Sequence, residues 1–218
     1  MDQYWGAGYY GSAHAQLPDG RQVTATLTEG YAENHRDTRG FLSLQVRKPC
    51  VVVPFAGPCV PMASGSLELT GDQVEFDRGL RRGAVEDVTL TLTTPSYYLP
   101  GSGVPGGPPP GGGIPPLPPI DGNPSVPILV PATSEEITVS LVFTGTGTVS
   151  RHAEHTVADC GADSTGCQST RIAAERTADV TLTLGWASGD TTTADSDAGQ
   201  LFYGQGVDAA AFLPTGER

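Results

Sequence analysis

The residues best suited to chemistry lie in two neighbouring segments, 147–157 and 168–178, which flank a pair of cysteines. If 147–157 forms a strand, His152 and Glu154 share one face, because strand side chains alternate between faces. A return strand would bring Glu175 across to them, which makes a polar cluster of one histidine and two carboxylates. Such a cluster could ligate a metal ion or transfer protons. The plainer interpretation is that these side chains pair with Arg171 across the strands. The HExxH motif, which would favour a metal ion, is absent from the sequence.

The four cysteines form two close pairs, Cys50 with Cys59 and Cys160 with Cys167. Neither pair has CxxC spacing, and no histidine lies at zinc-finger spacing from them. We expect two local disulfides, each closing a loop of about ten residues and adding about 2.5–3 kcal/mol in the chain-entropy model. Disulfides persist in oxidising compartments, so the expected location is secreted or at the cell surface. The alternative is four buried free thiols in a cytosolic protein.

A second cluster of carboxylates is a candidate calcium site. Asp190, Asp195 and Asp197 lie close together in GDTTTADSDAG, among glycine and threonine. Calcium takes oxygen ligands of this kind, but the full EF-hand spacing with its final glutamate is absent. A solvated acidic loop is the plainer interpretation, and no other cofactor is indicated.

Aromatic residues near the ends of the expected strands are candidates for recognition. Trp5, Tyr9, Tyr10 and Trp186 could form an exposed platform for a sugar or a peptide, because such rings supply rigid contact area. Their alternative role is to cap the hydrophobic core.

Known catalytic motifs are missing from the sequence. It contains no GxSxG elbow, no P-loop and no Rossmann glycine pattern. A hydrolase with a site centred on His152 and Glu154 stays open, since triads are assembled in space from distant residues. We nevertheless expect a protein without catalysis.

Charge narrows the range of partners. The formal net charge is -12, and an acidic surface repels nucleic-acid phosphates and anionic lipid headgroups. No segment has the run of about 20 apolar residues that spans a bilayer.

Lys48 is the only lysine, a bias typical of a high-GC bacterial genome. The segment MDQYWGAGYY lacks the basic start and apolar run of a signal peptide, so either the chain is a mature form or the expectation of export is wrong.

Period-two alternation of apolar and polar residues dominates the chain and predicts strands. Each run is short, rich in β-branched residues and bounded by Gly, Pro, Asp or Asn. The expected fold is all-β, an antiparallel β-sandwich or flattened barrel. The apolar residues of these runs are expected to face the core. The runs are Val23–Leu27, Leu42–Val46, Leu67–Leu69, Val88–Leu92, Ile137–Phe143 and Val180–Leu184.

The segment Pro95 to Pro131 breaks this pattern. It holds most of the prolines, which cannot donate to a sheet ladder. We expect an extended segment, partly polyproline II, acting either as a mobile linker or as a long crossover docked on the domain. The expected organisation is a single domain over 1–218 with insert 95–131; the alternative is two subdomains, 1–94 and 132–218, joined by the insert.

The stretch from Ile137 to His155 resembles a segment of uncharacterised secreted bacterial β-rich proteins. Their pattern is an alternating strand, then an aromatic residue followed by T-G-T-G, then a return strand with Arg and His. Here these positions are Phe143 to Gly147, Arg151, His152 and His155. The resemblance implies export and β structure and implies no activity.

The expected function is therefore a non-catalytic extracellular structural or interaction module, with protein as its partner. It could be a self-assembling subunit of a surface layer or filament, in contact with its neighbour through the proline-rich or the N-terminal aromatic segment. A carbohydrate-binding module and a secreted hydrolase are the alternatives.

Overall fold

A computed structural model describes residues 2–32, 39–47, 62–99, 128–158 and 164–212. The expected all-β class is confirmed, because every regular element in these residues is a strand. No helix that could cross a membrane occurs in the same residues. The strands are β1 (Asp2–Gln16), β2 (Gln22–Ala32), β3 (Arg39–Arg47), β4 (Ala63–Thr70), β5 (Val74–Phe76), β6 (Arg82–Thr94), β7 (Tyr97–Leu99), β8 (Ile128–Val130), β9 (Thr133–Gly145), β10 (Ser150–Ala158), β11 (Ser164–Gly185) and β12 (Thr191–Phe212).

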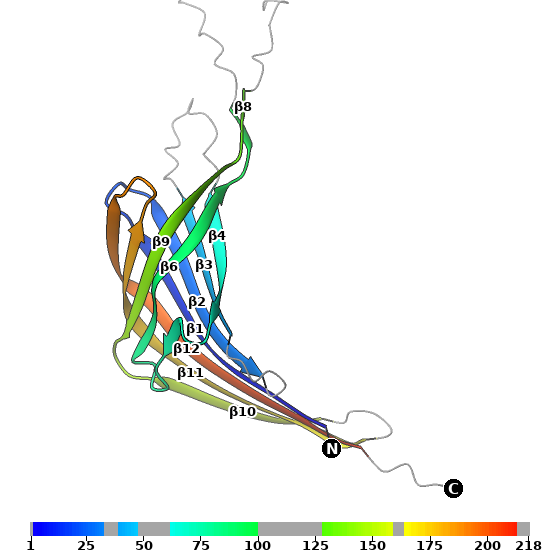
Figure 1. Ribbon diagram of the computed structural model, residues 1–218. Helices are drawn as coiled ribbons and strands as arrows, with labels where there is room; N and C mark the ends of the chain where they lie inside the picture. The colour runs from blue at the N-terminus through cyan, green and yellow to red at the C-terminus, as the bar shows by residue number, and fades with distance from the viewer. Residues whose placement is uncertain (1, 33–38, 48–61, 100–127, 159–163, 213–218) are drawn as a thin grey trace, which may run out of the picture.

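Ten of these strands form one antiparallel sheet that closes on itself as a ring (Figure 1). The order around the ring is β1, β2, β3, β4, β6, β9, β11, β12 and back to β1. Strands from before and after the proline-rich segment therefore pair directly, as β6 does with β9. The seam between β4 and β6 is narrow, with a register of only Ser64 opposite Thr93.

The core fills the ring and consists of the inward-facing residues that alternation predicts. Phe143 and its alternate neighbours on β9 are at most 1% exposed, and the threonines and serines between core residues face outward. No polar or charged side chain is buried in the part of the chain described. The predicted core residues that are confirmed as buried are Val23, Ala25, Leu27, Leu42, Leu44, Val46, Leu69, Val88, Leu90, Leu92, Ile137, Val139, Leu141, Phe143, Val180, Leu182 and Leu184.

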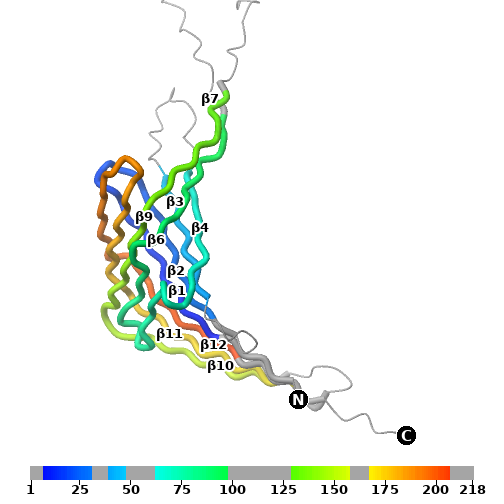
Figure 2. The backbone as a smooth tube through the Cα atoms, viewed as in Figure 1, coloured from blue at the N-terminus to red at the C-terminus, as the bar shows by residue number. Residues whose placement is uncertain are grey.

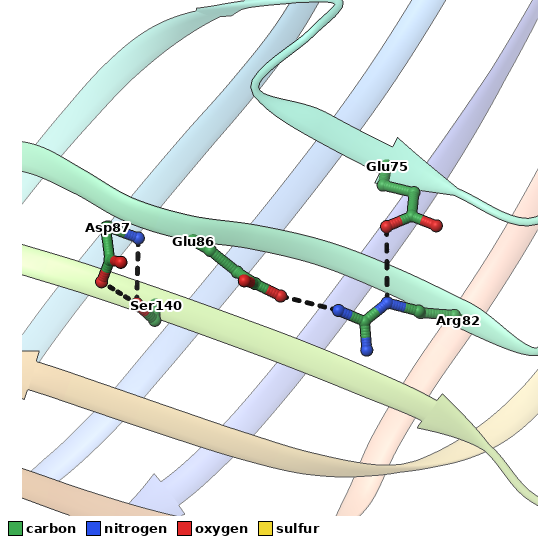
Figure 3. Close-up of polar contacts among 5 residues, drawn as sticks. All are labelled: Glu75, Arg82, Glu86, Asp87 and Ser140. Atoms are coloured by element: carbon green, nitrogen blue, oxygen red, sulfur yellow. Dashed lines mark hydrogen bonds and ion pairs between the residues drawn. The ribbon is translucent and has the colours of Figure 1, made fainter.

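A bulge in β6 interrupts the β6–β9 ladder. Glu86 and Asp87 together lie opposite Ser140, because the register shifts between Val85 and Val88. Asp87 has φ +53°, a left-handed conformation that few residues other than glycine adopt. Ser140 stabilises it twice, by accepting from the Asp87 backbone N–H at 2.9 Å and donating to its Oδ1 at 3.0 Å (Figure 3). The bulge thus depends on one serine hydroxyl.

Part of the sheet extends well beyond the ring. The longest strands, β11 and β12, run past the core together with the first half of β1, and β10 pairs along their border (Figure 2). We call this extension the projecting sheet: β10 with residues 164–175 of β11, 202–212 of β12 and 2–10 of β1. β9 and β10 pair with the same edge of β11 one after the other, since Gly145 lies opposite Ala178 and Ser150 opposite Glu175.

The two ends of the proline-rich segment leave the ring together. β7 and β8 pair with each other and continue from β6 and β9. The sequence predicts an extended segment over 95–131, whereas the structure places short paired strands at both of its ends. Residues 100–127 lie outside the described residues, so the choice between a linker and a docked crossover stays open.

Candidate functional site

The predicted polar cluster lies on the outer face of the projecting sheet. The register places Glu154 opposite Arg171, His152 opposite Ala173 and Ser150 opposite Glu175. His152, Glu154 and Glu175 therefore share one face, as predicted, and all three side chains are exposed. Glu154 and Arg171 are thus register partners, but their side chains are not among the ion pairs of the described residues.

The cluster is not assembled as a metal centre. No group of three or more His, Cys, Asp or Glu side chains that could hold a metal ion occurs in the described residues. Glu175 lines an open pocket of about 340 Å³ with Ser150, Tyr10 and Phe202, and neither His152 nor Glu154 lines it. The two carboxylates and the histidine are spread along the strands and do not converge on one point.

An exposed aromatic row lies beside the polar cluster. Ser150, Glu175, Phe202 and Tyr10 are successive register partners across four strands. Tyr10 and Phe202 are each 39% exposed, and the Phe202 ring leans over Gly204, whose added Cβ would lie 3.1 Å from it. Of the predicted aromatic residues, Tyr10 is therefore available on this face.

Tyr9 belongs to the opposite face and closes the base of the core. Its ring stacks on Phe76, with centroids 5.3 Å apart, and contacts the tilted ring of Tyr203, with centroids 4.9 Å apart. The predicted platform of Tyr9 with Tyr10 is not formed, because consecutive strand residues point to opposite faces. Trp5 lies opposite Val207 in the projecting sheet, and its side chain is outside what the structure describes.

Glu29 lies beside Tyr9 on this inner face, as its register partner on β2. The side chain is half-buried, and burial raises the pKa of the Glu29 carboxyl above its ordinary value. Its ionised form is therefore less favourable in the folded protein than in water.

The outer border of the projecting sheet is open. In the described residues β10 pairs with β11 and with no strand on its other side. All seven residues from Arg151 to Val157 are exposed, and β10 contains neither proline nor lysine. Its outward backbone N–H and C=O groups form a template on which another strand could pair.

A second site lies at the opposite end of the ring, where β6 and β9 pass into β7 and β8. A pocket of about 510 Å³ opens there, and apolar side chains together with Trp186, Tyr97, Arg21 and Glu135 line it. The volume is within the range of small-molecule sites, which often occupy the mouths of closed sheets. We call it the mouth pocket.

Trp186 is held in place in the mouth pocket by two neighbours. Its Nε1 donates to Thr192 Oγ1 at 3.0 Å, and the Arg21 guanidinium lies 4.0 Å from the ring centroid. Asp19 in turn accepts from Arg21 Nε at 2.6 Å. Burial raises the pKa of the Asp19 carboxyl, but the hydrogen bonds from Arg21 outweigh it and keep that pKa below its ordinary value. The arrangement leaves one Trp face covered by a cation.

The predicted calcium residues are separated. Asp190 lies in the β11–β12 turn and accepts from Ser188, and Asp195 on β12 accepts from Thr181 Oγ1 at 2.8 Å. Asp197 is exposed two residues further on. The acidic loop of the sequence is therefore a turn with a strand, in which Asp190 accepts from a hydroxyl of the same turn and Asp195 from a hydroxyl of the neighbouring strand.

The predicted disulfides stay predictions. Cys50, Cys59 and Cys160 lie outside the described residues, and Cys167 lies on β11 opposite Ala158 and Ala210.

Phe202 and Phe41 are exposed aromatic residues that the sequence patterns above do not predict. Phe202 and Phe41 belong to the outward set of their strands, which the alternation with Leu201 and Leu42 could have indicated.

No family model, no curated protein and no solved structure matches the chain.

Proposed function

We propose that the protein is a non-catalytic extracellular interaction module that self-associates through the open β10 edge of the projecting sheet. The observation that carries this proposal is a nine-residue edge strand whose residues 151–157 are all exposed. Natural edge strands are commonly protected by proline, by charged side chains, lysine above all, or by covering elements. In the described part of the chain β10 has no proline, no lysine and no strand on its outer side, and its charged side chains are Arg151 and Glu154.

The rest of the projecting sheet supports the same role. It carries Tyr10 and Phe202 on one face at 39% exposure each and Ile172 on the other at 42%. Exposed apolar residues gathered on a projecting element are typical of contact surfaces. The extracellular part of the proposal depends on the two close cysteine pairs, because disulfides persist in oxidising compartments.

Light scattering after size-exclusion chromatography tests this function. We expect the native chain to reach a multiple of its 22.6 kDa mass as its concentration rises. The double variant Ser150→Lys/Thr156→Lys should stay monomeric, because lysines on an edge strand oppose pairing. A matched control, Thr89→Lys/Thr91→Lys, adds the same charge to exposed positions of β6 in the ring and should associate like the native chain. A native chain that is monomeric at every concentration would contradict the proposal.

Carbohydrate binding in the mouth pocket is a second candidate function. It is favoured by the combination of Trp186 and Tyr97 with the hydroxyls of Thr133 and Ser134 and the charged groups of Arg21 and Glu135. Aromatic faces beside hydrogen-bonding groups suit sugars.

Affinity electrophoresis in polysaccharide gels tests this second function. We expect retardation of the native chain and its loss in Tyr97→Ala and Glu135→Gln. Trp186→Ala should also lose it, but Trp186 packs against the core, so its unfolding curve must be measured alongside. Equal mobility of the native chain with and without each polysaccharide would argue against carbohydrate.

A further inference from the structure

We infer that the partner of β10 is β10 of a second copy, paired antiparallel about a two-fold axis that passes through Ala153. This inference rests on the proposed function and specifies its register. A strand edge that meets the same edge of a second copy does so isologously, with the two-fold axis perpendicular to the sheet. The two strands then run antiparallel, and residues that lie opposite each other share a face.

Any residue of β10 can lie on the axis, because this geometry requires only that opposed residues have the same parity, and a central residue leaves most of the nine-residue strand paired. Centring on Arg151 opposes that guanidinium to its own copy, and centring on Glu154 opposes two carboxylates. Centring on His152 or on His155 opposes a histidine to its own copy. Like charges directly opposite each other are destabilising.

Centring on Ala153 gives complementary pairs instead. His152 of each copy lies opposite Glu154 of the other, which makes two reciprocal imidazole–carboxylate pairs on the outer face. Ser150 lies opposite Thr156, and small Ala153 meets itself at the axis. On the inner face Arg151 lies opposite His155, the one pair in this register that is not complementary in charge. The His155 imidazole has Thr170 Oγ1 at 2.9 Å from its Nδ1.

The charges already on the projecting sheet agree with this register. Glu154 has Arg171 as its partner on β11, so it would lie between Arg171 of its own copy and the second copy's histidine. On the other side of His152, the next residues across the sheet are Ala173, Gly204 and Gly8. On this face the acidic groups of its own copy within two register positions of His152 are Glu154 on β10 and Glu175 on β11. The joined outer face would carry a continuous row of polar pairs flanked by small residues.

A charge reversal tests the register. His152→Glu places two new carboxylates opposite the Glu154 side chains and should raise the dimer dissociation constant about tenfold or more. The double variant His152→Glu/Glu154→His exchanges the two charges and should restore association toward the native value. Both constants come from sedimentation equilibrium on the full chain.

Cysteine cross-linking tests the same register independently. Ala153→Cys should form a covalent dimer on a non-reducing gel, since opposed Cβ atoms lie about 4.5–5.5 Å apart. Ser150→Cys carries the same extra thiol but should not cross-link, because its two copies lie six residues apart, about 20 Å.

The outcomes separate this inference from the proposed function. A native chain that never associates removes both. If the native chain associates, but the charge exchange does not restore association and Ala153→Cys does not cross-link, the register is overturned. The proposed function then still stands. Cross-linking of Ser150→Cys in preference to Ala153→Cys would likewise overturn it.

Discussion

Single side chains in this protein make contributions to the free energy of unfolding that can be measured one at a time. Glu29 is an example, because burial raises the pKa of its carboxyl. A carboxyl with a raised folded-state pKa costs stability above that pKa and regains it as the pH falls and the group is protonated.

We therefore predict that Glu29→Gln increases the free energy of unfolding at pH 7. The gain should shrink as the pH falls through the raised pKa and should level off below the ordinary value of 4.5. Urea titrations of both chains between pH 3 and 7 measure it. An effect that is independent of pH would show that burial of the charge is not the cause.

Ser140 is a second such residue, since its hydroxyl makes both of the hydrogen bonds that hold Asp87 at φ +53°. We predict that Ser140→Ala lowers the free energy of unfolding by about 1–2 kcal/mol, at about 1 kcal/mol per lost bond. Ser43→Ala, a similarly half-buried serine on β3, is the control and should change it by less than about 0.5 kcal/mol. Equal losses in the two variants would assign the effect to strand propensity.

At the scale of elements, the ring depends on the close approach of β4 and β6. A Cβ added at Gly65 would lie 2.3 Å from the backbone oxygen of Thr91, and a backbone atom at a seam cannot move aside cheaply. We predict that Gly65→Ala lowers the free energy of unfolding by about 1–3 kcal/mol, as overpacking does.

Gly185→Ala is the matched control for the seam. The nearest atom to its added Cβ is Thr138 Cβ at 3.5 Å, an ordinary contact. Denaturant curves for both variants provide the comparison, and a loss at Gly185 as large as that at Gly65 would show that the seam has no special role.

At the scale of the whole molecule, the ring and the projecting sheet differ in what supports them. The ring surrounds a core of side chains such as Phe143 and Leu141, both 0% exposed, whereas residues 151–157 of β10 are all exposed. Opening free energies follow the number of buried contacts.

We predict that backbone amides of 150–158 exchange with deuterium faster than those of 137–143 in dilute protein. At concentrations where the chain associates, exchange in 150–158 should slow, and exchange in 137–143 should not change. Mass spectrometry of peptides at two concentrations tests both statements. Slowing that is confined to 97–99 and 128–135 would instead place the contact at the mouth pocket.

Much of the core follows from the sequence, because alternation is a property of adjacent residues. Val180, Leu182 and Leu184 are separated by threonines, and any strand built from them has one apolar face. The same alternation places His152 and Glu154 on one face of β10. Glu175 shares that face, because it lies opposite Ser150, which belongs to the same alternate set.

What the sequence by itself determined is therefore which face of each alternating run is apolar, whereas β1 and most of β12 contain no run that was predicted as a strand. Only the tertiary structure decided that Tyr9 closes the core while Tyr10 faces solvent, that Asp190 and Asp195 lie apart, and that β10 has an open edge. The physical reason is that strand pairing joins residues far apart in the chain, such as Tyr9 with Tyr203. The period-two alternation of apolar and polar residues shows which face of a strand is apolar. It does not show which strand lies beside it or where the sheet closes.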